Sequence, residues 1–114
     1  YDPGHIMENI IYNELLRRGY SVDVGVVTDR TGGANTQKEI DFVVNDADKK
    51  IYIQSAFQMD ADKKESSELA SLILTKDFFK KIIVRMDIPH NFYDDNGIFH
   101  CNLIDLLLGR VELF

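Results

Sequence analysis

The segment Glu39–Ala56 places the strongest constraint on how this chain folds. It contains two apolar runs, Ile40–Val44 and Ile51–Phe57, joined by the polar segment Asn45–Lys49. Short runs of β-branched and aromatic residues on either side of a turn are typical of a β-hairpin. The sequence therefore predicts two strands here, and their apolar faces require further elements to cover them.

Acidic residues interrupt the first of these strands. Strict alternation divides its side chains between two faces, Glu39, Asp41 and Val43 on one and Ile40, Phe42 and Val44 on the other. An acidic pair on one face of an apolar strand is costly to bury unless it is exposed, paired or bound to a cation. We therefore treat Glu39 and Asp41 as candidate site residues.

The remaining elements follow from periodicity, caps and turn residues. We expect helices over His5–Arg18, from about Asp60 to Lys76, and over Leu103–Leu108 with Asn102 as its N-cap; we expect strands over Ser21–Val27, Gln37–Val44, Lys50–Phe57, Lys80–Met86 and Ile98–Cys101. The 114 residues suit one domain. The order α-β-β-β-α-β-β-α predicts an α/β fold with three layers, in which a central mixed sheet has helices on both faces.

Charge and composition narrow the classes of function. The net charge of −6 argues against a broad basic face, although a local patch around Arg17, Arg18 and Arg30 stays open. The single Cys101 cannot form an internal disulfide, and we expect a cytoplasmic protein. No apolar run approaches the roughly 20 residues of a membrane span. The chain begins without an initiator methionine, so we expect a domain of a longer protein.

Several common kinds of site are unsupported. The histidines His5, His90 and His100 lack the spacing of metal ligands, and Cys101 lies in an apolar strand where it is expected to be core. The pair Gly32–Gly33 has no Walker pattern around it and is read as a plain turn.

An acidic group is the candidate that remains. Glu8 falls in the apolar arc of the first helix, which Met7, Ile11 and Leu15 share. It is either a first-turn carboxylate favoured by the helix dipole or an acid directed at the sheet. In the second case Glu8, Asp41 and Glu39 would offer oxygen ligands of the kind that Mg²⁺ accepts.

This arrangement resembles the PD-(D/E)XK phosphodiesterase fold of restriction endonucleases and archaeal Holliday-junction resolvases. Proteins of that fold combine an acid on the first helix, an Asp on a hairpin strand and an E-x-K on the next strand. The matching positions here are Glu8, Asp41 and Tyr52-Ile53-Gln54. The resemblance implies a restriction endonuclease-like α/β domain.

Four segments add a more specific resemblance that covers nearly the whole chain. They are GHIMENIIYNELLRRGY, EIDFVV, KKIYIQSAF and NGIFHCNLIDLLL. In this order they are similar to the C-terminal domain, of unknown function, in a prokaryotic family of predicted AAA-type ATPases. The resemblance implies that an ATPase domain of the same chain is a partner. The G-x-x-x-x-G-K-[ST] pattern of such an ATPase is absent from these 114 residues.

The departures from the nuclease pattern decide the expected function. Tyr52 stands where the resemblance places an acid, and Gln54 where it places a lysine. We therefore expect a non-catalytic accessory domain without a cofactor, which docks on a protein, on the ATPase domain or on DNA. The alternative is a metal-dependent DNA phosphodiesterase similar to Holliday-junction resolvases, with Mg²⁺ on Glu8, Glu39 and Asp41 and with Gln54 positioning water. The sequence leaves the oligomeric state open.

Overall fold

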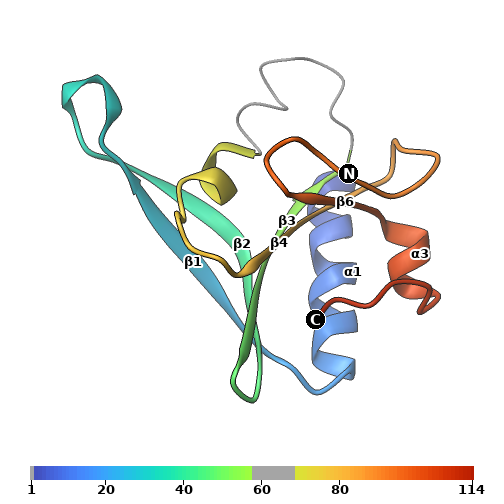
Figure 1. Cartoon of the computed structure of the whole chain (residues 1–114). Coiled ribbons are helices and arrows are strands. Elements are labelled where there is room, and N and C mark those ends of the chain that lie inside the picture. The colour runs from blue at the N-terminus through green and yellow to red at the C-terminus, as the bar shows by residue number, and fades with distance from the viewer. Residues whose placement is uncertain (1, 58–68) are drawn as a thin grey trace.

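A six-stranded mixed sheet is the centre of the computed structural model, which describes residues 2–57 and 69–114 (Figure 1). The strands lie in the order β1-β2-β3-β4-β6-β5. Their bounds are β1 Ser21–Asp29, β2 Thr36–Asp46, β3 Lys49–Ala56, β4 Lys80–Arg85, β5 Phe92–Tyr93 and β6 Phe99–Asn102. Strands β1, β2 and β3 are antiparallel neighbours, β3, β4 and β6 are parallel, and β5 runs antiparallel to β6. The mixed sheet with helices confirms the predicted α/β class.

Helices begin at side-chain caps that the sequence supplies. The carboxylate of Asp2 accepts from the backbone N–H of Gly4 at 3.0 Å and so begins α1, Pro3–Arg17. The predicted cap of α3, Leu103–Leu107, is confirmed, because Asn102 accepts from Ile104 N at 2.8 Å. Of the predicted second helix, residues 69–73 are helical, and its expected start near Asp60 lies outside the described residues.

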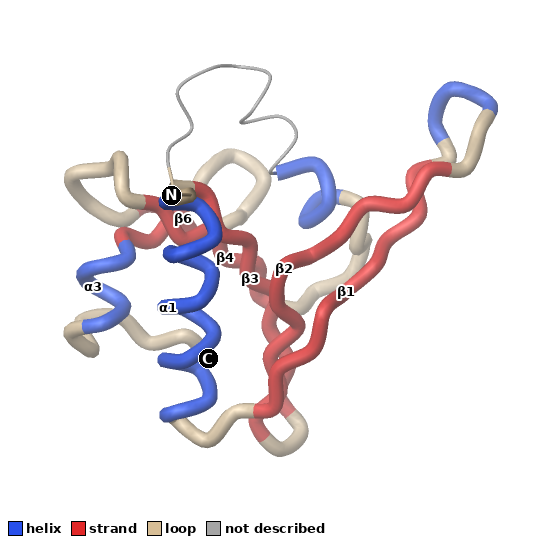
Figure 2. The backbone as a smooth tube through the Cα atoms, turned by 180° about the vertical axis from the view of Figure 1, so that it is seen from behind, coloured by secondary structure: helices blue, strands red, loops and turns tan. Residues whose placement is uncertain are grey.

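Apolar side chains fill both faces of the sheet. Helices α1 and α3 lie side by side over one face (Figure 2). The buried residues of that layer include Met7, Ile11, Leu15, Phe42, Val44, Ile51, Ile53, Ile82, Val84, Leu103 and Leu106. On the other face the helical residues 69–73 supply Leu69 and Leu72, which pack with Ile40, Ala56, Ile83 and Ile98. Helical residues therefore cover the sheet from both sides. Cys101 is buried and unpaired, as predicted.

A β-bulge in β2 breaks the predicted alternation. Asp23 pairs with Val43 and Gly25 pairs with Ile40, so Asp41 and Phe42 together oppose the single residue Val24. Ile40 consequently packs in the same layer as Val43, whereas Phe42 lies in the α1 layer. The prediction that Ile40 shares a face with Phe42 and Val44 is therefore wrong. The extra residue at the bulge shifts the alternation of side chains by one position, so Ile40 faces the opposite side of the sheet.

Beyond the bulge, β1 and β2 form a projecting arm, residues 25–40, that extends away from α1 and α3 (Figure 1). A short 3-10 turn, Thr31–Gly33, closes its tip within the predicted loop. Both glycines of this turn have positive φ, 77° at Gly32 and 80° at Gly33, in agreement with the plain turn expected there. The segment between the predicted strands Lys80–Met86 and Ile98–Cys101 contains the two-residue strand β5, Phe92–Tyr93, which was not predicted.

Candidate functional site

The strand fork is the point at which β2 separates from β3, and it comprises Asp41, Gln54 and Ser55. The two strands pair from Asp46 and Lys49 up to Phe42 and Ile53, and no further. Where the strands separate, hydrogen bonds to side chains replace the backbone hydrogen bonds of the β-ladder. The Asp41 backbone N–H donates to Gln54 Oε1 at 2.6 Å, and the Ser55 backbone N–H donates to Asp41 Oδ2 at 2.8 Å. These two bonds satisfy backbone donors that the departing strands leave unpaired.

Gln54 also ties the fork to the second helix. Its Nε2 donates to Ser71 Oγ at 2.9 Å, and both side chains are buried, Gln54 at 5% and Ser71 at 2% exposure. Since the oxygen and the nitrogen of the amide both have protein partners, the orientation of Gln54 is fixed. The side chain joins β2, β3 and the helical residues 69–73.

Asp41 is the carboxyl group with the most altered acidity at the fork. Burial raises its pKa to about 6, the hydrogen bond from Ser55 N–H opposes this, and the negative charges of Glu8 and Glu39 raise the pKa further. Glu8 of α1 and Glu39 of β2 therefore act electrostatically on Asp41. A carboxyl group with this pKa exchanges its proton close to neutral pH.

Tyr52 belongs to a different set of contacts. Its hydroxyl donates to Asp77 Oδ2 at 2.7 Å, and Lys81 Nζ binds the other oxygen of Asp77 at 2.9 Å. The Tyr52 ring meets Phe79 edge-on, with centroids 6.1 Å apart. Burial and the bond to Asp77 raise the pKa of Tyr52 to about 12. Of the predicted pair, the structure brings Gln54 to Asp41, whereas Tyr52 lies with Asp77 instead.

The predicted metal ligands do not form a preformed cluster. Within residues 2–57 and 69–114, no three His, Cys, Asp or Glu side chains lie close enough to hold a metal ion together. Glu8 and Glu39 thus act on Asp41 through charge, without the convergence that a ready cation site needs. Their role as ligands stays a hypothesis.

A buried polar network at the ends of β4 and β6 was missed by the sequence analysis. Arg85 Nη1 lies 2.9 Å from His100 Nδ1, and His100 Nε2 lies 2.8 Å from Asp94 Oδ2. Because arginine only donates, Nδ1 accepts and the proton sits on Nε2, which donates to Asp94. Arg85 also makes two bonds to Asp87. The alternation of β6 could have indicated that His100 faces inward, but its partners are distant in sequence.

Fold and site together define an α/β domain in which the carboxyl group of Asp41 is hydrogen-bonded between β2 and β3, where the two strands separate. Residues 3–101 match the family described as Domain of unknown function (DUF4143). The chain belongs to this family, in agreement with the expected resemblance to a domain of unknown function.

A protein of Haemophilus influenzae described as an uncharacterized protein is 42% identical to this chain over 78 residues. The match covers 68% of the chain and 17% of that relative, so the matched region spans less than a fifth of the relative's length. No helix in the described ranges, 2–57 and 69–114, combines the length and apolar character that crossing a membrane requires.

Proposed function

We propose that this chain is a non-catalytic binding domain with a nuclease-like fold, and that it serves as an accessory part of a longer AAA-type ATPase. The single observation that carries the non-catalytic part is the double use of the Gln54 amide. Its oxygen accepts from Asp41 N–H and its nitrogen donates to Ser71. A side chain with both ends bonded to the framework is not free to bind a metal or position water.

The geometry of the hairpin strengthens this proposal. Two ligands on neighbouring strands can share one Mg²⁺ only if they lie opposite each other, because each oxygen must come within about 2.0–2.1 Å of the ion. Phe42 pairs with Ile53, so Gln54 is the next residue across from Asp41. The E-x-K pattern then falls on Gln54 and Ala56 rather than on Tyr52 and Gln54. Ala56 is 3% exposed and packs in the core.

Neither position of the pattern therefore carries a charge. An amide in place of a carboxylate weakens the hold on a divalent cation, and a buried methyl group in place of a lysine removes stabilisation of charge on the scissile phosphate. Loss of one preorganised stabilising donor typically costs about 10²–10³ in rate. The two losses together favour a binding role over phosphodiester hydrolysis.

The ATPase context rests on the resemblance of the four segments given above. The relative from Haemophilus influenzae is several times longer than its matched region, which leaves room for such a domain. A direct test is ATP hydrolysis by the full-length protein that contains this chain. Hydrolysis supports the accessory role, and a full-length protein that neither binds nor hydrolyses ATP would overturn this part of the proposal.

Cleavage of DNA tests the non-catalytic part. The full-length protein is incubated with linear and branched DNA in the presence of Mg²⁺ or Mn²⁺, beside the matched double variant Glu8→Ala, Asp41→Ala. We expect the two proteins to give equal background. Cleavage that disappears in the double variant would overturn the proposal.

That outcome would favour the second candidate, a metal-dependent DNA phosphodiesterase. The charges of Glu8 and Glu39, which add to the effect of burial in raising the pKa of Asp41, are the observation on its side, because a cation shared by neighbouring carboxylates relieves their repulsion. Calorimetric titration with Mg²⁺ separates the candidates before any substrate is needed. Stoichiometric binding that is lost in Asp41→Asn supports the phosphodiesterase.

A further inference from the structure

A groove lies at the end of the sheet where β3 and β4 begin, opposite to the strand fork at the other end of β3. We call it the Lys–Phe groove, after six of its seven lining residues, Lys49, Lys50, Lys80, Phe78, Phe79 and Phe114; the seventh is Ile51. Its volume is about 320 Å³, the lower end of the range for ligand pockets. Since Ile51 pairs with Lys80 across the two strands, the floor of the groove is a fixed part of the sheet.

Two consecutive aromatic side chains, Phe78 and Phe79, line this groove and are exposed to solvent. Phe78 is fully exposed and Phe79 is 43% exposed. The Phe79 ring packs against Tyr52, whereas the Phe78 ring is not part of either core cluster of the sheet. Exposed aromatic rings next to a hollow are the usual anchors of protein interfaces, because they bury a large apolar area at little cost in side-chain entropy.

The lysines of the groove have no carboxylate partner within residues 2–57 and 69–114. Lys50 Nζ lies 5.4 Å from the centre of the Phe79 ring. Lys80 Nζ lies 5.2 Å from the centre of the Phe99 ring and donates to the Glu112 carbonyl at 3.1 Å. In a chain of net charge −6, this is a local positive surface around an apolar hollow.

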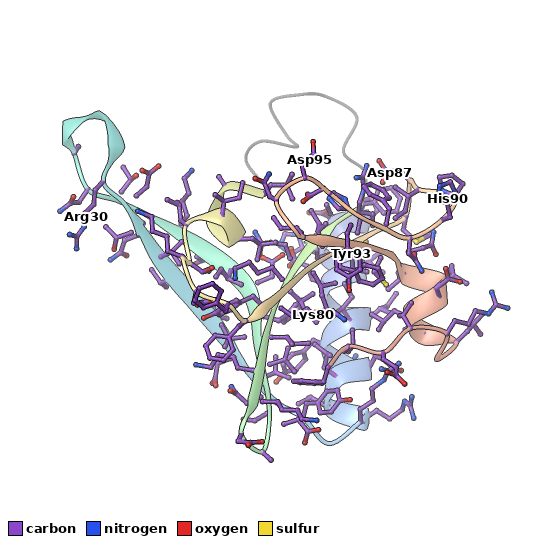
Figure 3. All side chains as sticks on the ribbon, in the orientation of Figure 1. Arg30, Lys80, Asp87, His90, Tyr93 and Asp95 are labelled. Carbon is purple, nitrogen blue, oxygen red and sulfur yellow. The ribbon has the colours of Figure 1, made fainter. Side chains whose placement is uncertain are left out.

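The positive surface is separate from the other basic position that the sequence suggested. Arg30 lies at the tip of the arm, whereas Lys80 lies at the body of the sheet (Figure 3). A ligand that contacts the Lys–Phe groove therefore does not need to reach the arm.

We propose that the Lys–Phe groove binds an acidic peptide segment of a partner protein. One bulky apolar side chain of the segment packs on Phe78 and Phe79, and flanking carboxylates pair with Lys49 and Lys80. The inference rests on the proposed function, because it names the surface and the partner chemistry of the binding domain. Complementary charge and an apolar anchor are the two features that such a segment shares with the groove.

Single-stranded nucleic acid is the competing ligand, and the charge distribution disfavours it. A nucleic acid extends its phosphates along the surface, where it would meet the carboxylates of Asp46, at the end of β2, and of Asp48, on the turn before Lys49. The net charge of −6 repels a long polyanion as a whole. A short peptide confines its few charges to the lysines.

The test measures fluorescence anisotropy of labelled peptides with the full-length protein. The probe is a set of short peptides, each with a central leucine, phenylalanine or tryptophan flanked by glutamates. We expect saturable binding that weakens as salt is added. In Phe78→Ala and in the double variant Lys49→Glu, Lys80→Glu, we expect affinity to fall about tenfold or more, the loss typical of an interface anchor. Phe78 is fully exposed, so its removal leaves the fold intact.

Matched controls are Leu108→Ala, an exposed apolar residue of another surface, and Lys38→Glu, a charge reversal on the arm. Both should bind the peptides as the unaltered protein does. Three results would overturn the inference: no saturable binding by any peptide, equal binding by Phe78→Ala, or tighter binding of an oligothymidine strand than of every peptide. Each of these leaves the cleavage test of the proposed function untouched, so the two proposals fail separately.

Discussion

Asp41 is both a hydrogen-bond acceptor between the strands and a carboxyl group whose negative charge is disfavoured by its surroundings. Its carboxylate accepts the Ser55 N–H and so joins the separated strands, yet burial and the charges of Glu8 and Glu39 raise its pKa to about 6. A protonated carboxyl group still accepts a hydrogen bond through its carbonyl oxygen, so the fork does not need the negative charge. A substitution of Asp41 can therefore remove the negative charge and keep the hydrogen bond to Ser55.

Replacing Asp41 by asparagine should stabilise the fold at neutral pH and have less effect in acid. A pKa raised from the ordinary 3.8 to about 6 means that the folded state prefers the protonated form. The stability that this preference contributes is complete below about pH 4 and is lost as the pH rises to about 6 and above. The gain in free energy of unfolding of Asp41→Asn over the unaltered protein should therefore grow across this interval, in urea titrations at a series of pH values.

The matched control for this series is Asp46→Asn, at an exposed carboxylate of the same strand. Its difference from the unaltered protein should change little with pH. A flat pH profile for Asp41→Asn would show that the Asp41 carboxyl group titrates as an ordinary exposed aspartate.

Gly25 is required by close packing at the bulge. A Cβ atom at this position would lie 2.7 Å from Val43 Cγ2 and 3.1 Å from Ile40 Cβ. We expect Gly25→Ala to lower the free energy of unfolding by about 1–3 kcal/mol, the usual cost of an overpacked site. Chemical denaturation measures this change. Val26→Ala on the same strand, at an exposed side chain, is the control, and an equal loss in both variants would contradict the packing argument.

Among the elements, those with strong local signals were predicted from sequence. Periodicity placed the first helix within two residues of its observed ends, and Asn102 placed the last one. The bulge could not be predicted, because Ile40 is apolar and suits either face. Strand β5 could not be predicted either, since two residues are too few to show a period.

In the candidate site, too, residues with a local sequence signal were predicted and contacts between distant segments were not. Alternation selected Asp41, the resemblance to the nuclease pattern selected Gln54, and the structure joins them. The bond partners Ser71 and Asp77 were not predictable, because contacts between distant segments leave no local pattern. For the same reason Tyr52 was grouped with Asp41 although its hydroxyl lies at Asp77.

His100 links β4 to the turn before β6, so its loss should weaken this part of the sheet. His100→Leu leaves Arg85 Nη1 and Asp94 Oδ2 without their shared partner in a buried region. We expect the free energy of unfolding to fall by about 1–3 kcal/mol, the cost of an unsatisfied buried polar group. Urea denaturation provides the measurement, and His90→Leu at an exposed histidine is the control. Equal stability of the two variants would contradict a structural role for the network.

For the molecule as a whole, the proposed function predicts indifference to divalent cations. A ligand that binds only the folded state raises the thermal midpoint, and the rise grows with its concentration. Because the described residues hold no preformed metal cluster, millimolar Mg²⁺ should leave the midpoint of unfolding unchanged relative to an equal ionic strength of Na⁺. Differential scanning fluorimetry measures this. A rise with Mg²⁺ that Asp41→Asn abolishes would contradict the prediction.

The projecting arm has a consequence for how backbone amide protons exchange with heavy water. Residues 36–40 of β2 pair with β1 alone, and β1 is the edge of the sheet, so each strand of the arm has an unpaired side. Strands β3 and β4 have neighbours on both sides and a buried layer above and below. Val27 and Ile40 at the base of the arm pack in the core, but opening the arm outward from them exposes little buried surface, whereas freeing β3 and β4 requires unfolding of the whole domain. We therefore expect backbone amide protons to exchange fast in the arm and slowly in the central strands β3 and β4.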